Sequence, residues 1–194
     1  DDKTFTYYYD NRGFVTQIDR IRTDGSGKTY TISYGDKITF NCSDGTKWVA
    51  TLNSNGFVGS MVCYKANGNE SDRAVFSYNA DNQLTRVTYD DDEFFNITYS
   101  GGDITSCSFS RASGYSESWT YSYGSSGQDM ILNSGNVMEF DNIFGIDLDD
   151  YNLLYYIGAL GEPTLHLPLA GLVSGNSITG TWTTDDAGRA TKIS

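Results

Sequence analysis

One ten-residue pattern occurs four times in the chain and restricts the fold more than any other feature. The four segments are residues 9–18 (YDNRGFVTQI), 52–61 (LNSNGFVGSM), 78–87 (YNADNQLTRV) and 184–193 (TDDAGRATKI). In each segment the second residue is Asp or Asn and the fifth is Gly or Asn. An Asp or Asn side chain can accept hydrogen bonds from its own turn, and Gly or Asn tolerates positive φ. The pattern therefore predicts a tight turn between two strands at each place.

A second hairpin pattern accompanies the first. Residues 32–40 (ISYGDKITF) and 97–105 (ITYSGGDIT) each show a strand that ends in Tyr, a turn with Gly and Asp, and then Ile-Thr. This arrangement is typical of a β-hairpin. The two patterns together predict two copies of a four-strand meander and two additional hairpins. The copies are residues 1–42 and 73–110, and the additional hairpins are residues 46–66 and 176–194.

Residues 145–161 (GIDLDDYNLLYYIGALG) break the strand pattern. Their apolar residues recur at helical spacing, and Gly161 with Pro163 supplies a stop, so we predict a helix over about residues 147–160. Because the segment is apolar on most sides, this helix should be buried against the sheet. The predicted fold is all-β: a single long antiparallel meander of ten or more strands, curled into an open barrel, with the short helix packed in it.

The chain is acidic, and its charge is unevenly distributed. It has 25 acidic and 13 basic residues, which gives a formal net charge of −12, and no Lys or Arg occurs in residues 112–188. A surface that binds nucleic acid needs a basic footprint, so the charge excludes nucleic acid as a general partner. With 194 residues, of which 38% are apolar, the chain can bury a core. We predict a single β-rich domain over residues 1–194.

The Y-D-x-x-G-x-x-T-x-I turns resemble YD-type repeats, in which Tyr-Asp turns stack a long β-sheet. The two hairpin types, with residues 155–161 (YYIGALG) and the pair Leu167-Pro168, are similar to a Bacteroidetes family of domains of unknown function with a porin-like fold. The similarity covers essentially the whole chain. It implies a porin-like open barrel in a cell-envelope lipoprotein, located in the periplasm or at the outer-membrane surface. The lipid-bearing N-terminal Cys would then precede residue 1. The resemblance assigns no catalytic residue.

Two observations concern insertion into a membrane. No run of about 18 apolar residues occurs, so no helix is expected to span a bilayer. In the predicted strand over residues 14–23, Arg20 and Arg22 share a face with Phe14 and Ile18. A strand of this kind does not fit the continuous apolar band of a membrane-spanning barrel. We therefore expect that the chain does not span a membrane.

Two acidic clusters could supply oxygen ligands to a metal ion. Residues 90–93 (DDDE) are adjacent carboxylates, but a calcium loop spaces its ligands and has a Gly at its sharp turn. Residues 147–150 (DLDD), with Asp141 and Asn142 nearby, fit the first turn of the predicted helix. We interpret the first cluster as a solvated hairpin turn and the second as a helix start, and we predict no metal site.

The usual signatures of nucleophilic catalysis and of zinc binding are absent from the sequence. His166 lies in the apolar context LHLP, and no G-x-S-x-G motif accompanies it. Cys42, Cys63 and Cys107 each lie in a strand-like run, and no C-x-x-C motif occurs. We predict buried thiols rather than a disulfide framework or a zinc site. The sequence thus assigns no catalytic residue and no cofactor.

Aromatic side chains are the remaining candidates for a functional site. Trp48, Trp119 and Trp182 could stack on sugar rings, although aromatic residues in strands usually pack the sheet. We favour a non-catalytic cell-envelope module that binds a glycan or a protein, with these three rings as the ligand-stacking residues. Two alternatives stay open: a glycoside hydrolase that acts through two carboxylates about 5–9.5 Å apart, and a purely structural or assembly protein. The oligomeric state stays open as well.

Overall fold

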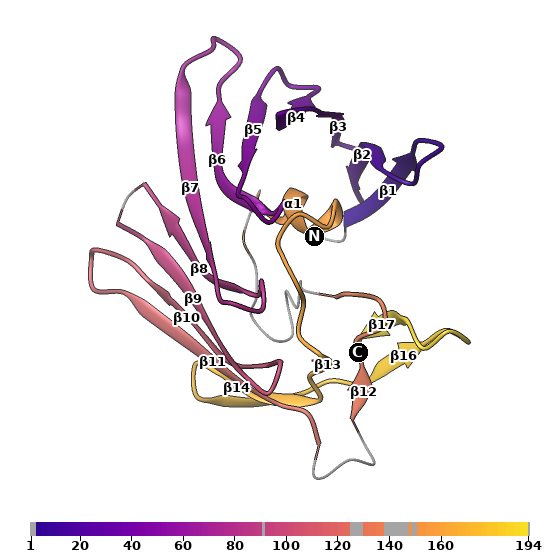
Figure 1. Cartoon of the computed structure of the whole chain (residues 1–194), viewed down its shortest axis with the longest axis vertical. Helices are drawn as coiled ribbons and strands as arrows, with labels where there is room; N and C mark the ends of the chain where they lie inside the picture. The colour runs from indigo at the N-terminus through magenta and orange to yellow at the C-terminus, as the bar shows by residue number, and fades with distance from the viewer. Residues whose placement is uncertain (1–2, 91, 125–129, 138–147, 149–150, 194) are drawn as a thin grey trace. The chain divides into compact units, whose positions relative to one another are not determined.

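The computed structural model describes residues 3–90, 92–124, 130–137, 148 and 151–193. Its main sheet has 13 strands, ordered from β1 to β11 in chain order and then β14 and β15 (Figure 1). This order confirms the predicted meander, and β1 and β15 are the two end strands. The strands are β1 (Lys3–Tyr9), β2 (Val15–Arg22), β3 (Gly27–Tyr34), β4 (Lys37–Cys42), β5 (Lys47–Leu52), β6 (Val58–Tyr64), β7 (Glu70–Tyr78), β8 (Leu84–Tyr89), β9 (Phe94–Ser100), β10 (Asp103–Ser110), β11 (Ser116–Ser122), β14 (Ala170–Val173) and β15 (Asn176–Thr179).

Two short antiparallel pairs accompany the main sheet. One joins β12 (Ile131–Leu132) to β13 (His166–Leu167), and the other joins β16 (Trp182–Thr184) to β17 (Ala190–Ile193). Within the predicted hairpin 176–194, the paired strands are therefore β16 and β17, whereas β15 pairs with β14 in the main sheet. No helix in the described residues has the length and apolar character needed to cross a bilayer.

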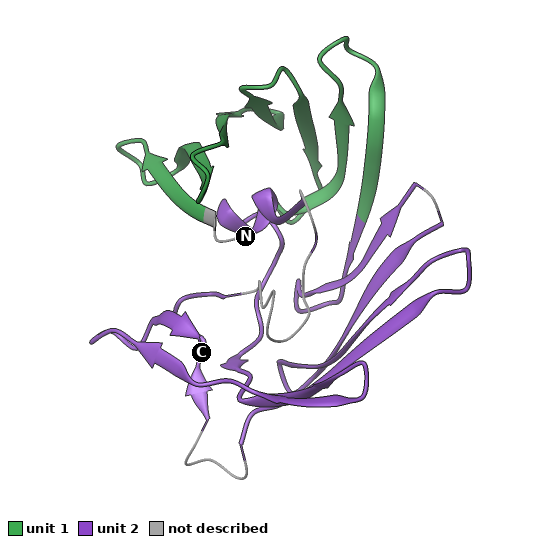
Figure 2. Ribbon diagram, turned by 180° about the vertical axis from the view of Figure 1, so that it is seen from behind, with its two compact units in different colours: residues 1–75 green, residues 76–194 purple. Residues whose placement is uncertain are grey.

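The chain divides into two compact units, residues 1–75 and residues 76–194, which Figure 2 shows in green and purple. Unit 1 contains nine acidic and nine basic residues, so its formal charges cancel. Unit 2 contains sixteen acidic and four basic residues. The whole net charge of −12 therefore belongs to unit 2.

The core of unit 1 is built by strands such as β4, in which buried and less buried residues alternate. In β4 the side chains of Ile38, Phe40 and Cys42 are buried, whereas the residues between them are not. The neighbouring β3 presents Tyr30 opposite Cys42 and Ile32 opposite Phe40. Each large apolar side chain buried in this way stabilises the fold by roughly 1.5–3 kcal/mol relative to exposure.

The four predicted turns form as expected. In each turn, Oδ1 of the second residue accepts hydrogen bonds from the backbone N–H groups two and four residues later. These residues are Asp10, Asn53, Asn79 and Asp185. The fifth residue of each turn has positive φ, as predicted: Gly13 (86°), Gly56 (86°), Asn82 (62°) and Gly188 (75°). The prediction holds because every one of these contacts is local in sequence.

The helix α1 (Asn152–Tyr156) is shorter than the predicted span of residues 147–160. It ends early because Gly158 adopts φ = 71° and donates to the Tyr155 carbonyl, while Ala159 donates to the Leu154 carbonyl. These two bonds form a Schellman motif, which terminates a helix before the expected stop at Gly161. The acidic start predicted for this helix lies outside the described residues, apart from Leu148.

The helical segment packs on the sheet of unit 2, as the sequence predicts. The Tyr151 ring lies 5.9 Å from the Phe76 ring of β7 and 5.5 Å from the Tyr89 ring of β8. Leu153 and Leu154 of α1 are buried as well. This packing places the end of α1, and the chain that follows it, next to the hairpin ends of unit 2.

Candidate functional site

Residues 161–167, which we call the connector, cross the ends of two hairpins in unit 2. Gly161 forms an isolated antiparallel bridge with Gln83. The Glu162 N–H donates to the Asn82 carbonyl at 2.9 Å, and the Leu165 N–H donates to the Gly102 carbonyl at 3.0 Å. An extended segment is thus bound through its backbone to the β7–β8 turn and to the β9–β10 turn.

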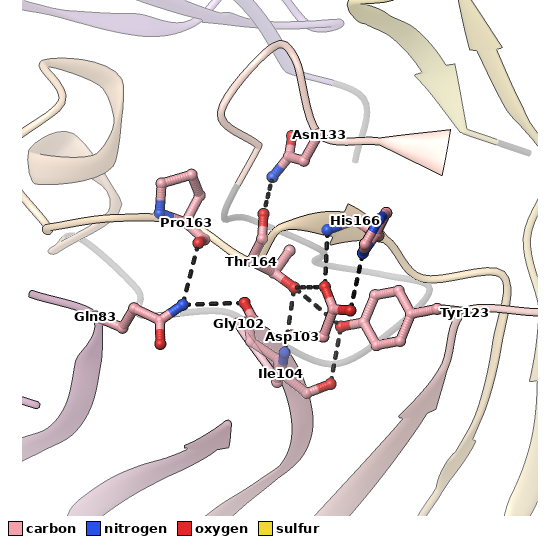
Figure 3. A network of polar contacts seen from close by, with 9 residues as sticks. All are labelled: Gln83, Gly102, Asp103, Ile104, Tyr123, Asn133, Pro163, Thr164 and His166. Atoms are coloured by element: carbon pink, nitrogen blue, oxygen red, sulfur yellow. Dashed lines mark hydrogen bonds and ion pairs between the residues drawn. The ribbon is translucent and has the colours of Figure 1, made fainter. Parts of the chain in front are cut away.

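A network of side chains, which we call the connector network, strengthens this attachment (Figure 3). Oδ1 of Asp103 accepts hydrogen bonds from the His166 N–H at 2.8 Å and from Oγ1 of Thr164 at 3.2 Å. Oδ2 of Asp103 lies 2.9 Å from Nδ1 of His166, which donates because a carboxylate only accepts. The side chains of Asp103 and His166 are only 13% and 16% exposed, so water competes little with these bonds.

Thr164 is the centre of the connector network and is almost fully buried. Its Oγ1 accepts a hydrogen bond from the Ile104 N–H at 3.1 Å and lies 3.2 Å from the Tyr123 hydroxyl. The Tyr123 hydroxyl donates to the Ile104 carbonyl at 2.8 Å. Burial raises the pKa of Tyr123 above its ordinary value, so this phenol keeps its proton.

Two buried amides complete the connector network, as Figure 3 shows. Nε2 of Gln83 donates to the Gly102 carbonyl at 3.0 Å and contacts the Pro163 carbonyl at 3.5 Å. Nδ2 of Asn133 donates to the Thr164 carbonyl at 3.0 Å. Polar groups at this depth must be hydrogen-bonded, and here they bond the connector.

Sequence reasoning missed most of this network, although signals were present. Residues 132–136 (LNSGN) are a fifth example of the turn pattern: Oδ1 of Asn133 accepts from the Val137 N–H, and Asn136 has φ = 53°. Gln83 follows the fifth position of its turn, where Phe14 and Phe57 stand in two other turns. This position is aromatic in two of the four predicted turns and polar in the other two, Gln83 and Arg189, so its side chain was only a partial signal.

The connector network holds the chain together. Asp103 and His166 are arranged like the acid–imidazole pair of a catalytic triad, but no hydroxyl of the described residues is shown bonded to the imidazole. The nearby hydroxyl of Thr164 bonds to Asp103, to Ile104 and to Tyr123 rather than to the imidazole. No group of three or more potential metal ligands occurs among the residues that the structure describes.

Unit 1 carries a different kind of site at its own hairpin ends. We call Arg12, Phe14 and Tyr34 the turn-end cluster. The Phe14 and Tyr34 rings lie 5.3 Å apart at 49°, and the Arg12 guanidinium lies 5.1 Å from the Phe14 centroid. The rings are 48% and 36% exposed, respectively.

Hydrogen bonds hold the turn-end cluster in place. The Tyr34 hydroxyl donates to the Val15 carbonyl at 2.8 Å. Two nitrogens of Arg12 donate to Oδ2 of Asp10 at 3.0 and 2.8 Å, and this partner lowers the pKa of Asp10. The cluster therefore combines two accessible rings with an oriented guanidinium.

The three Trp residues predicted to stack on a ligand do not come together at one site. Trp48 and Trp119 are 5% and 6% exposed, so neither ring can offer a face to a sugar, and both are core residues. Their strands alternate, and each Trp falls on the buried face. Trp182 is half-buried, and its Nε1 donates to the Pro168 carbonyl at 2.7 Å.

The remaining candidates behave as the sequence predicts where they are described. Cys42, Cys63 and Cys107 are buried and form no disulfide, and burial raises the pKa of Cys107 to about 12, so its thiol is inert. In the acidic cluster 90–93, Glu93 pairs with Arg111 at 2.9 Å, and Asp91 lies outside the described residues. The same holds for Asp141, Asn142, Asp147, Asp149 and Asp150.

The described residues form an all-β antiparallel meander with one short helix, and a family model identifies the family to which this fold belongs. The model of the domain of unknown function DUF4595, which has a porin-like fold, matches residues 8–192. The chain therefore belongs to this family, as its hairpin motifs suggest. No curated protein matches the chain.

Two solved structures share the fold. A porin-like protein from Bacteroides uniformis matches with a TM-score of 0.78 and 23% identity, over 98% of this chain and 81% of that chain. A porin-like protein from Bacteroides vulgatus matches with a TM-score of 0.57 and 14% identity, over 97% of this chain and 86% of that chain. The predicted all-β, porin-like fold is thus confirmed.

Proposed function

We propose that the chain is a non-catalytic binding module of the cell envelope, and that its ligand docks on the turn-end cluster of unit 1. The observation that carries this proposal is the combination of exposure and order in Phe14 and Tyr34. Both rings are accessible to solvent, yet a hydrogen bond and a cation–π contact fix their positions. Because the two rings are exposed, burial in the core does not explain why they are held in place. Their order therefore favours a role in recognition.

The order of the cluster lowers the cost of binding. Side chains that are already fixed lose little conformational freedom when a ligand arrives. Tyr and Arg also contribute more than other residue types to the energy of binding surfaces. Arg12 is a residue of this kind, and its bonds to Asp10 orient it before any ligand is present.

The connector network supports the non-catalytic part of the proposal. A glycoside hydrolase needs two carboxyl groups about 5–9.5 Å apart that flank the sugar. The contacts described for Asp103 lead to Thr164 and to His166, not to a second carboxyl group. A carboxylate used in this way holds the connector rather than a substrate.

The location in the cell envelope is the second part of the proposal, and membership of the family supports it. A tagged full-length protein expressed in a Bacteroides host should fractionate with the envelope and incorporate labelled palmitate. Recovery in the cytosol without label would contradict this location.

The binding function is tested with purified protein on a glycan array and against a random peptide library. We expect a ligand in one of the two sets, and we expect Phe14→Ala to abolish its binding. Tyr115→Ala is the matched control, because Tyr115 is also an exposed ring (47%) beneath an arginine, but it lies in unit 2. Trp182→Ala tests the remaining Trp.

The result is decisive in either direction. Absence of any ligand in both sets would overturn the proposal. So would binding that Phe14→Ala leaves intact while Tyr115→Ala or Trp182→Ala removes it. Thermal unfolding of each variant shows that the fold is retained.

A further inference from the structure

Arg86 of β8 lacks the carboxylate partner that four other arginines of the chain have. Those four form ion pairs with nearby carboxylates at 2.7–2.9 Å, and they are Arg12, Arg73, Arg111 and Arg189. Arg86 forms no ion pair with a carboxylate of the described residues, although unit 2 contains sixteen acidic and only four basic residues. Its positive charge is therefore not neutralised within the described part of the chain.

The guanidinium of Arg86 is nevertheless held in a fixed orientation. Its Nε donates to Oγ1 of Thr88 at 3.2 Å, and its Nη1 donates to Oδ1 of Asn96 at 3.1 Å. The group also lies 4.1 Å from the centroid of the Phe94 ring. A guanidinium has five N–H donors, so three of them are left for an acceptor that the described residues do not supply.

Arg86 begins a row of polar side chains across four neighbouring strands. The register places Asn96 opposite Arg86, Ser108 opposite Asn96, and Ser118 opposite Ser108. Nδ2 of Asn96 donates to Oγ of Ser108 at 3.4 Å. We call these four residues the Arg86 row. Successive residues of a strand face opposite sides, and Phe95, next to Asn96, is buried, so the row lies on the face that is turned away from the core of unit 2.

The first copy of the meander shows that the fold does not need an arginine at this position. The repeated turn pattern aligns Gln17 with Arg86 and, two residues later, Asp19 with Thr88. In the first copy, Oδ1 of Asp19 accepts hydrogen bonds from Nε2 of Gln17 at 3.0 Å and from Oγ1 of Thr29 at 2.8 Å. The same two positions thus carry an internally bonded carboxylate in one copy and a cation without a carboxylate partner in the other.

The position of the Arg86 row within the sheet restricts the kind of ligand. Strands β8 to β11 each have a neighbour on both sides, as Figure 1 shows, so their backbone groups are used within the sheet. An extended peptide binds a sheet by pairing with an edge strand, and the row offers only side chains. Hydroxyl and amide side chains are suited to the hydroxyl groups of a saccharide.

The charge of the ligand follows from Arg86 and from the unit that contains it. The planar guanidinium binds carboxylate or sulfate oxygens through parallel N–H donors. Unit 2 has a large excess of acidic residues, which repels a densely charged polymer. A saccharide with a single acidic group among neutral sugars satisfies both conditions.

We propose that the Arg86 row is a binding site for an acidic saccharide. The carboxylate or sulfate group of one sugar accepts hydrogen bonds from the remaining N–H donors of Arg86. Neighbouring sugar hydroxyls bond to Ser108 and Ser118 along the row. This site is separate from the turn-end cluster of unit 1 and goes beyond the function proposed above.

The test titrates the purified full chain with matched pairs of disaccharides. The acidic members are a glucuronic acid–glucose disaccharide and a sulfated lactose, and the neutral members are cellobiose and lactose. Isothermal titration calorimetry should show that at least one acidic member binds about 10-fold more tightly than its neutral counterpart. The pair that shows this preference identifies the anion as a carboxylate or a sulfate. The side-chain Nε–H signal of Arg86 should shift during the same titration, followed by NMR.

Variants locate the preference at the Arg86 row. Arg86→Gln introduces the residue that the first copy carries, so the fold should be retained, and the preference for the acidic member should disappear. Arg111→Gln is the matched control, because Glu93 already pairs with that arginine, and the preference should stay unchanged. Ser118→Val should weaken binding of the acidic member about 3-fold, since one hydrogen bond to the sugar is lost. Thermal unfolding checks the fold of each variant.

Three results would overturn the inference. They are equal affinity within both pairs, a preference that persists in Arg86→Gln, and unchanged affinity in Ser118→Val, which would leave a bare anion site without sugar recognition.

The test also separates the inference from the proposed function. Phe14→Ala should leave the acidic preference intact, because Phe14 belongs to unit 1. A preference that Phe14→Ala removes and Arg86→Gln retains would overturn the inference and support the turn-end cluster. A preference that only Arg86→Gln removes, with no ligand that depends on Phe14, would overturn the proposed function and leave the inference intact.

Discussion

The two copies of the four-strand meander share their first turn, but the structure describes a covering segment only on the second copy. In the second copy the connector covers the hairpin ends, and Gln83 and Asp103 become part of a buried network. In the first copy Phe14 stands where Gln83 stands and is 48% exposed, and Lys37 precedes the Ile-Thr pair as Asp103 does. The copies also differ in their second turn, where only Gly101 and Gly102 have positive φ.

The physical reason lies in hydrogen bonding by the side chains at these positions, which are Gln83 and Asp103 in the second copy. A covering segment brings backbone N–H groups that need acceptors, because an unpaired buried polar group costs about 1–3 kcal/mol. Gln83 and Asp103 supply such acceptors and donors, whereas a ring supplies none. The second copy can therefore bury a segment of its own chain, and the first copy keeps its rings accessible.

The largest effect is expected at the point where the connector touches the β7–β8 turn. Gly161 has φ = 87°, and a Cβ there would overlap the Asn82 carbonyl oxygen and lie 2.8 Å from Cε1 of Tyr78. We expect Gly161→Ala to lower the free energy of unfolding by about 3 kcal/mol in urea denaturation. Gly13→Ala has similar φ but open space around the new Cβ, so about 1 kcal/mol is expected. Equal losses of unfolding free energy in the two variants would contradict the stated difference between the surroundings of Gly161 and Gly13.

A smaller effect is expected where the two copies differ in charge. Asp103→Ala removes the acceptor of His166 and of Thr164, and should lower the free energy of unfolding by about 2 kcal/mol. Lys37→Ala, at the equivalent exposed position, should leave stability unchanged within error. Chemical denaturation measures both, and a comparable loss in Lys37→Ala would show that the first copy is also covered.

A smaller difference in stability is expected between variants of the two turn-capping side chains, Asn79 and Asp10. Asn79 caps its turn through Oδ1 and also donates from Nδ2 to Oε1 of Gln83 at 3.1 Å. Asn79→Ala should cost about 1 kcal/mol, because two kinds of bond are lost. Asp10→Ala should cost less, since the additional partner of Asp10 is the Arg12 guanidinium, whose side chain is 68% exposed, rather than a residue that bonds the connector. A thermal shift assay ranks the two variants, and a reversed order would contradict the role given to Gln83.

The smallest effect is expected at the hairpin ends that the connector does not reach. Both copies have a partly exposed ion pair there. Lys28 of the first copy pairs with Asp44, and Glu93 of the second copy pairs with Arg111. Hydrogen bonding to Lys28 lowers the pKa of Asp44 below its ordinary value.

A carboxylate with a lowered pKa in the folded state stabilises the protein above its unfolded pKa, near 3.9, and this contribution is lost as pH falls. Asp44→Asn should therefore cost about 0.5 kcal/mol at pH 7, the value of a solvent-exposed pair, and progressively less as the pH falls below about 4 toward the lowered pKa of Asp44. Unfolding measured at pH 7 and at a series of acidic pH values tests this. A loss that grows on acidification would contradict the assignment.

Much of the fold follows from local patterns, but little of the candidate site does. The Asp10 and Asn79 turns are readable because donor, acceptor and positive φ lie within five residues. The partner of His166 cannot be predicted from local sequence, because Asp103 lies 63 residues away. Burial of Trp48 and Trp119 depends on which face of each strand the sheet covers, and composition does not specify this.

The sequence by itself determined the hairpins, their order and the all-β class, because turn chemistry and period-two alternation act over a few residues. Tertiary structure decided which hairpin ends are covered, where α1 stops, and which aromatic rings reach solvent. These outcomes depend on contacts between segments distant in the chain, such as Gln83 with Pro163 and Asp103 with His166. The two copies share their first turn, but within the described part of the chain a distant segment binds only the second copy.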